Sequence, residues 1–146
     1  MDNINWLSMV LATAMPLILG LIFFNNALFG NVLRGTPSNN NLDAKKASSV
    51  ITLIVLVVFS FFLSFFLLNF NNSGINQEGD FDTFLHGIWH GTFIAITVAS
   101  PVIFAIGYFS KMSWRKMLIL ILYWIVTLAL MGGILDAMNH WENVVI

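Results

Sequence analysis

The sequence predicts an all-α integral membrane protein, a four-helix bundle with antiparallel neighbours and short loops, and three observations support this. Of the 146 residues, 58% are hydrophobic and only 9% are charged, with a mean hydropathy of +0.85. The apolar residues gather in four long segments, and all six Lys and Arg residues lie between those segments. Soluble domains carry about 25% charged residues, so this composition excludes a soluble globular domain.

Four segments are long enough to cross a membrane as helices: Ile4–Phe29, Val50–Phe70, Phe84–Phe109 and Met117–Met138. A helix needs roughly 20 apolar residues to cross a hydrocarbon core about 30 Å thick. None of the four alternates apolar and polar residues, which is the pattern of a transmembrane barrel strand. The intervening segments are short and rich in turn-forming residues, so we expect residues 1–146 to form a single membrane domain.

The charged residues predict how the chain is oriented. The six basic residues fall in the first and third connections, which meet on one side of an antiparallel bundle: Arg34, Lys45, Lys46, Lys111, Arg115 and Lys116. Of the acidic residues, only Asp43 lies on that side. Connections rich in Lys and Arg stay in the cytoplasm. We therefore expect both termini to lie on the outer side of the membrane.

A group of metal-ligand side chains falls at the outer end of spans three and four. His86 and His90 are four residues apart on span three, and Asp136 and His140 are four residues apart on span four. Residues at this spacing share one face of a helix. If the two spans pack together, these four side chains converge at the outer mouth of the bundle.

This group has a functional and a structural interpretation. Imidazoles and a carboxylate suit a divalent transition metal such as zinc, copper, nickel or iron, histidines on facing helices can bind haem, and histidine can relay protons. In the structural interpretation, the same side chains only hydrogen-bond between helices or contact lipid headgroups. Cysteine is absent, so thiolate sites and disulfides are excluded.

Small residues predict which helices touch. They recur every four positions in span three, at Gly87, Gly91, Ala95 and Ala99, and in span four, at Ala129, Gly133 and Ala137. Such repeats let helix backbones approach closely in lipid. The two stripes are expected to pack on each other, or one of them forms a contact between copies of the chain. Pro16 and Pro101 are expected to kink spans one and three.

Short motifs resemble a known family. The chain opens with Ile4-Asn5-Trp6, Phe29-Gly30 follows the first span, and the fourth span contains Tyr123-Trp124 and then Leu130–Leu135. This pattern resembles an uncharacterised, domain-of-unknown-function family of small bacterial membrane proteins. The resemblance implies four helices in the bacterial inner membrane and no established activity. That family often has Tyr-His where this chain has Tyr123-Trp124, so any role of that histidine is missing here.

These observations favour a non-enzymatic accessory or scaffold subunit, or a small oligomer. The alternative is a metal- or haem-binding protein, or a small-solute or proton transporter, that uses the His/Asp group. A membrane enzyme acting on lipid or a quinone has the least support, and no residue is assigned a catalytic role. The expected partners are the lipid bilayer and either a second copy or a larger membrane complex. A net charge of −1 excludes nucleic acid.

Overall fold

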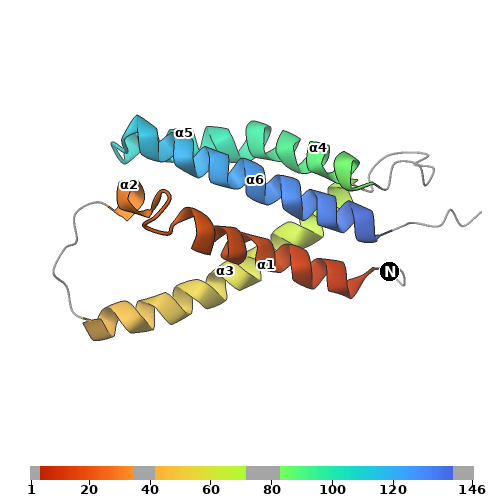
Figure 1. Cartoon of the computed structure of the whole chain (residues 1–146), viewed down its shortest axis with the longest axis horizontal. Coiled ribbons are helices and arrows are strands. Elements are labelled where there is room, and N and C mark those ends of the chain that lie inside the picture. The colour runs from red at the N-terminus through yellow and green to blue at the C-terminus, as the bar shows by residue number, and fades with distance from the viewer. Residues whose placement is uncertain (1–3, 35–41, 72–82, 140–146) are drawn as a thin grey trace, which may run out of the picture.

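A computed structural model describes residues 4–34, 42–71 and 83–139, and within them it is helical without any strand (Figure 1). The elements are α1 (Trp6–Phe23), α2 (Gly30–Arg34), α3 (Leu42–Asn71), α4 (Phe84–Ile94), a π-helical turn η2 (Ala95–Ala99), α5 (Ser100–Phe109) and α6 (Trp114–Met138). Four stretches are long and apolar enough to cross a membrane: Trp6–Phe23, Val50–Asn71, Phe84–Phe109 and Trp114–Met138. The all-α class is thereby confirmed.

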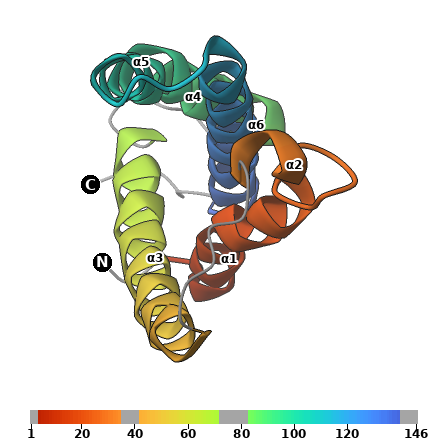
Figure 2. The same cartoon turned by 90° about the vertical axis from the view of Figure 1, so that its left-hand side faces the viewer.

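The four long stretches alternate in direction. The start of α1, the end of α3, the start of α4 and the end of α6 lie at one end of the bundle (Figure 1). The opposite end holds α2, the start of α3 and the turn between α5 and α6 (Figures 1 and 2). Sequential spans are therefore antiparallel, as predicted.

The first span ends earlier than predicted, at Phe23 instead of Phe29. The Asn25 side-chain oxygen accepts a hydrogen bond from the backbone N–H of Ala27 at 3.0 Å, and its carbonyl accepts one from Gly30 at 2.9 Å. Asparagine favours such turns over continued helix. A Cβ at Gly30 would collide with the Phe24 carbonyl, so this tight turn requires glycine. The apolar residues that follow Asn26 therefore belong to a turn and not to the span.

The turn between α5 and α6 is a Schellman motif with lysine in the left-handed position. The N–H of Met112 donates to the Gly107 carbonyl at 2.8 Å, and the N–H of Lys111 donates to that of Tyr108 at 3.2 Å. Lys111 has a φ of 51°. This position is usually glycine, because a side chain there is strained. The motif reverses the chain within a few residues and leaves α5 and α6 side by side.

The tightest contact in the fold is between α4 and α6, and it is made by glycines. A Cβ at Gly87 would collide with the Gly132 carbonyl, one at Gly132 with the Gly87 carbonyl, and one at Gly91 with the Leu128 carbonyl. The two stripes thus face each other, as predicted, through Gly87, Gly91 and Gly133, the last of which faces the ring of Phe84, the first residue of α4. Gly132 lies outside the predicted span-four stripe, and its backbone also approaches α4 closely.

The third span contains a π-helical turn before its proline. The N–H of Ser100 donates to the Ala95 carbonyl, five residues back, which is the π-helical spacing. The Ser100 hydroxyl donates to the same carbonyl at 2.9 Å, and the Thr97 hydroxyl donates to that of Phe93 at 2.7 Å. The irregularity expected at Pro101 thus takes the form of a π turn, and the Ala95 carbonyl within it and the Phe93 carbonyl before it accept side-chain hydrogen bonds.

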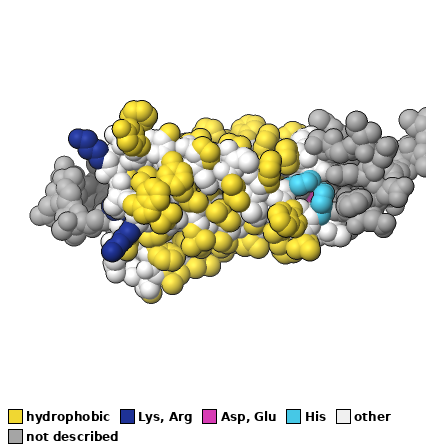
Figure 3. All heavy atoms as spheres, turned by 90° about the horizontal axis from the view of Figure 1, so that it is seen from above, with side chains coloured by type: hydrophobic (Ala, Val, Ile, Leu, Met, Phe, Trp, Pro, Cys, Tyr) yellow, Lys and Arg dark blue, Asp and Glu magenta, His cyan; other side chains and the backbone are white. Residues whose placement is uncertain are grey.

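The buried core lies where α1, α4 and α6 meet the second half of α3. Its members are Met9, Ala12, Leu67, Leu68, Ile94, Ala95, Leu128, Met131 and Leu135. Many large apolar side chains are exposed around this core, and on the face that Figure 3 shows they cover much of the middle of the bundle. Lys and Arg side chains mark one end and the histidines mark the other (Figure 3).

The glycine contact predicts that a single methyl group on α4 loosens the bundle. We expect Gly91→Ala to lower the free energy of unfolding by about 1–3 kcal/mol, because the new Cβ meets the backbone of α6, which cannot move aside cheaply. The measurement is denaturant unfolding in detergent followed by circular dichroism. Gly20→Ala is the control, since a Cβ at Gly20 meets no atom closer than 3.7 Å. Equal effects of the two substitutions would contradict this account.

Candidate functional site

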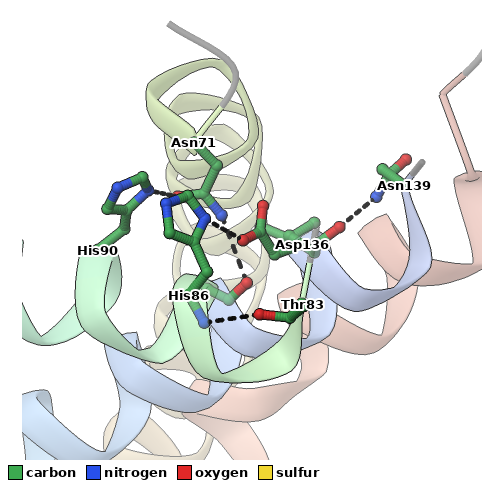
Figure 4. A network of polar contacts seen from close by, with 8 residues as sticks. Asn71, Thr83, His86, His90, Asp136 and Asn139 are labelled. Carbon is green, nitrogen blue, oxygen red and sulfur yellow. Dashed lines mark hydrogen bonds and ion pairs between the residues drawn. The ribbon is translucent and has the colours of Figure 1, made fainter. Parts of the chain in front are cut away.

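A polar cluster lies at the end of the bundle where α4 begins and α6 ends, opposite the turn between α5 and α6 (Figures 1 and 4). Its members are His86 and His90 from α4, Asp136 from the last turns of α6, and Asn71, the last residue of α3. α4 is positioned by its N-cap, because the Thr83 hydroxyl oxygen accepts a hydrogen bond from the backbone N–H of His86 at 3.2 Å. Three helices thus contribute polar groups to one place.

His86 and Asp136 form the central contact of the cluster. The Nδ1 atom of His86 lies 2.8 Å from the Asp136 Oδ2 atom, and the Asp136 carboxyl group is only 3% exposed. A carboxylate in the last turns of a helix faces the negative end of the helix dipole, which disfavours its charge. The hydrogen bond from the imidazole compensates part of that cost. A carboxylate accepts hydrogen bonds only, so Nδ1 carries the hydrogen of this bond.

His90 is held by Asn71. Its Nδ1 atom lies 3.0 Å from the Asn71 side-chain oxygen, and the Asn71 amide nitrogen donates to the Gly132 carbonyl at 3.4 Å. Asn71 is 1% exposed. The amide oxygen accepts, so here too Nδ1 is the donor and Nε2 is the atom at which the ring can take up a proton or bind a metal. A single asparagine thereby joins α3, α4 and α6.

The two imidazoles lie against each other. The ring centroids of His86 and His90 are 4.2 Å apart with an interplanar angle of 59°, and the Phe70 ring meets His90 edge-on at 5.4 Å. The two imidazoles and the Phe70 ring thus form one aromatic group beside the Asp136 carboxyl group.

A second polar contact fixes the end of α6. The side-chain nitrogen of Asn139 donates to the Ser8 hydroxyl and to the Leu135 carbonyl, both at 2.7 Å, and its oxygen accepts from the backbone N–H of Asn5 at 2.8 Å. Asn5 in turn donates through its side chain to the Met138 carbonyl at 3.0 Å and caps the start of α1. These bonds join the first and last spans and hold the Asp136 turn in place.

The structure places three of the four residues predicted to form a site in one cluster. His86, His90 and Asp136 lie in one cluster, whereas His140 lies outside the described residues. Among the residues that the structure describes, no three His, Asp or Glu side chains are arranged to hold a metal ion. Asn71 was missed by the sequence reasoning. Its only signal is a polar residue that ends the second apolar span at the depth of the histidines.

We expect the hydrogen bonds of Asn71 to stabilise this end of the bundle. Asn71→Ala removes the hydrogen bonds to His90 and to Gly132, and we expect it to lower the free energy of unfolding in detergent by about 1–3 kcal/mol. Asn69→Ala is the matched control, because Asn69 is exposed and bonds only to Phe65 of its own helix. The free energy of unfolding should fall strongly in Asn71→Ala and only slightly in Asn69→Ala. A loss of the same size in both would show that the contact between the helices contributes nothing.

Comparison with known proteins places this architecture in a family. No curated protein and no solved structure matches the chain significantly. A family model described as "Protein of unknown function (DUF1761)" matches residues 7–136, which include all four long apolar stretches apart from their outermost residues. This finding agrees with the family resemblance of the sequence motifs. The chain therefore belongs to the DUF1761 family of proteins of unknown function.

Proposed function

We propose that this chain is a multi-pass protein of the bacterial inner membrane, with four spans and both termini on the outer side, that acts as a non-enzymatic accessory or scaffold subunit or as a small oligomer. Exposed apolar side chains between two polar ends support insertion, because water would not tolerate so wide an apolar surface (Figure 3). The basic end supports the orientation, since Lys and Arg favour the cytoplasmic side.

The observation that carries the proposed role is the first half of α3. Every residue from Val50 to Val55 is exposed, which is more than one full helical turn without a buried face. Side chains on opposite sides of this segment, Ile51 and Leu53, are 62% and 51% exposed. A helix that served only its own bundle would bury one stripe along its whole length. The segment therefore offers a surface for a helix from another copy or from a larger complex.

The polar cluster supports a structural role for the groups inside the bundle. In the described part of the chain, every buried side-chain nitrogen and oxygen has a hydrogen-bond partner. Asn71 and Asn139 both bond across helix boundaries, to Gly132 and to Ser8 respectively. Hydrogen bonds of this kind hold helices together where no water competes.

Cross-linking from a single cysteine tests the role of α3, because the natural chain has none. Phe59 on α3 is 67% exposed and Phe93 on α4 is 58% exposed, so Phe59→Cys and Phe93→Cys form a matched pair. Each is labelled in native membranes with a thiol-specific photo-cross-linker. We expect one discrete product from Phe59→Cys, either twice the mass of the chain or a larger complex that purifies at fixed stoichiometry. Equal products from both variants, or none from either, would overturn the proposal.

The second candidate function is a metal, haem or proton site at the polar cluster. It is favoured by the 2.8 Å contact between His86 Nδ1 and Asp136, because histidines that bind metals commonly donate their other N–H to a carboxylate. The adjacent His90 ring supplies a second imidazole with the same assigned tautomer, in which Nδ1 is bonded and Nε2 is the coordinating atom. A proton or small-solute transporter would use the same pair to bind and release a proton.

Elemental analysis and an absorption spectrum of the untagged protein in mild detergent test this second candidate. If the cluster binds a metal or haem, we expect a stoichiometric metal or a haem band that is lost in both His90→Ala and Asp136→Ala and kept in Asn69→Ala. Absence of metal and chromophore from the natural protein would reject the metal and haem versions. Proton uptake by proteoliposomes that Asp136→Asn abolishes would then support the transport version, and equal uptake by empty liposomes would reject it.

A further inference from the structure

A lateral groove lies on the side of the bundle where α1 faces the exposed half of α3. Its volume is about 820 Å³, and Leu17, Leu21, Leu53 and Leu56 form much of its apolar lining. The groove is shaped by Pro16 and Gly20 of α1, and Tyr123 of α6 also lines it. The Tyr123 hydroxyl donates to the Pro16 carbonyl at 2.7 Å, so its polar atom is turned into the bundle.

A second hollow adjoins the groove at the basic end. Its volume is about 620 Å³, and its lining residues include Lys111, Lys116, Ser110 and Ser113. Phe24 lines both hollows. On α6, Lys116 and Leu120 line the hollow and Tyr123 lines the groove, and this spacing of four and then three residues keeps them on one helix face. The hollow with the two lysines thus continues into the apolar groove along one face of the bundle.

This combination has the chemistry of a phospholipid site. An acyl chain needs an apolar groove that opens to the side of the bundle, and a phosphate headgroup needs cations and hydrogen-bond donors at the membrane interface. We propose that the groove binds one anionic phospholipid, with an acyl chain between α1 and α3 and with its phosphate at Lys111 and Lys116. The proposal rests on the insertion and orientation given under Proposed function, which place this end in the cytoplasmic leaflet.

Charge decides between a lipid and a second copy of the chain as the occupant. The backbone of Arg34 at the end of α2 and the first turns of α3 with Lys45 and Lys46 lie at the same end as the α5–α6 turn (Figures 1 and 2). A second copy seated in this groove would bring its own basic end against Lys111 and Lys116, which is repulsive, whereas contacts on other faces of α3 are not affected. An anionic headgroup instead complements this basic end.

Native mass spectrometry of the protein in detergent, titrated with palmitoyl-oleoyl phosphatidylglycerol or with the zwitterionic phosphatidylcholine of the same chains, tests the headgroup. We expect one retained phosphatidylglycerol per chain and weaker retention of phosphatidylcholine. Lys116→Gln combined with Lys111→Asn should reduce this preference by about five-fold for each lysine removed. Asparagine is chosen at position 111 because it tolerates the left-handed backbone there. Arg115→Gln is the matched control, since Arg115 is exposed at the same end but lines neither hollow.

A variant that fills the groove tests the acyl chain. A Cβ at Gly20 meets only side-chain atoms, the Tyr123 oxygen at 3.7 Å and the Phe24 ring at 3.8 Å, so a side chain begins there without contact to another helix backbone. We expect Gly20→Leu to reduce retention of both lipids at least five-fold while circular dichroism and the elution volume stay unchanged. The lysine variant keeps the acyl groove and should lose only the preference for the anionic headgroup.

The outcomes separate this inference from the proposed function. If carbonate washing leaves the chain in the membrane but both lipids are retained equally and no variant changes this, the lipid site is wrong while membrane insertion stands. If carbonate washing releases the chain, the proposed insertion itself fails and the lipid site with it. If Gly20→Leu abolishes a dimer instead of lipid retention, the occupant of the groove is a second copy and the inference is overturned.

Discussion

The contact between the α4 and α6 backbones is the constraint on which the rest of the structure depends. Gly87 and Gly91 lie so close to Gly132 and Leu128 that no side chain fits between them. In the lipid environment that we propose for this chain there is little hydrophobic drive to bring two helices together, so close packing of backbones has to supply the attraction. The hairpin formed in this way is the wall against which α1 and α3 pack, through core residues such as Met9 and Leu67.

The same contact explains why the polar cluster exists where it does. Gly87 directly follows His86, and Gly132 lies four residues before Asp136. The close approach of the two glycine backbones therefore sets the distance between the imidazole and the carboxylate. Asn71 then closes the cluster by bonding to His90 and to the carbonyl of Gly132 itself. Packing and polar pairing thus stabilise each other, and neither helix can shift along the other without breaking both.

Much of this was predictable from the sequence, because small residues every four positions and long apolar runs carry direct physical meaning. The pairing of spans three and four followed from Gly87, Gly91 and Gly133, yet the backbone contact of Gly132 did not, since the residues four positions before and after it, Leu128 and Asp136, are not small. The end of α1 was hidden because Ala27 and Leu28 continue the apolar run beyond Asn25. Asn71 was overlooked because it stands beside other asparagines that mark a loop, and only the fold shows that it turns inward.

The π turn at Ala95–Ala99 acts as a one-residue insertion in an otherwise regular helix. From Gly91 to Gly107 a regular helix of 3.6 residues per turn would rotate by about 160°, whereas one extra residue taken up by the π turn leaves about 60°. Gly107 therefore comes round to the side of α6, where the Met117 side chain lies against it. The part of the third span before the π turn and the part after it therefore both turn a glycine toward α6, Gly91 in the first and Gly107 in the second. A homologue that lacks the extra residue at this turn would be expected to carry its small residue one position nearer, along the chain, to its equivalent of Gly91.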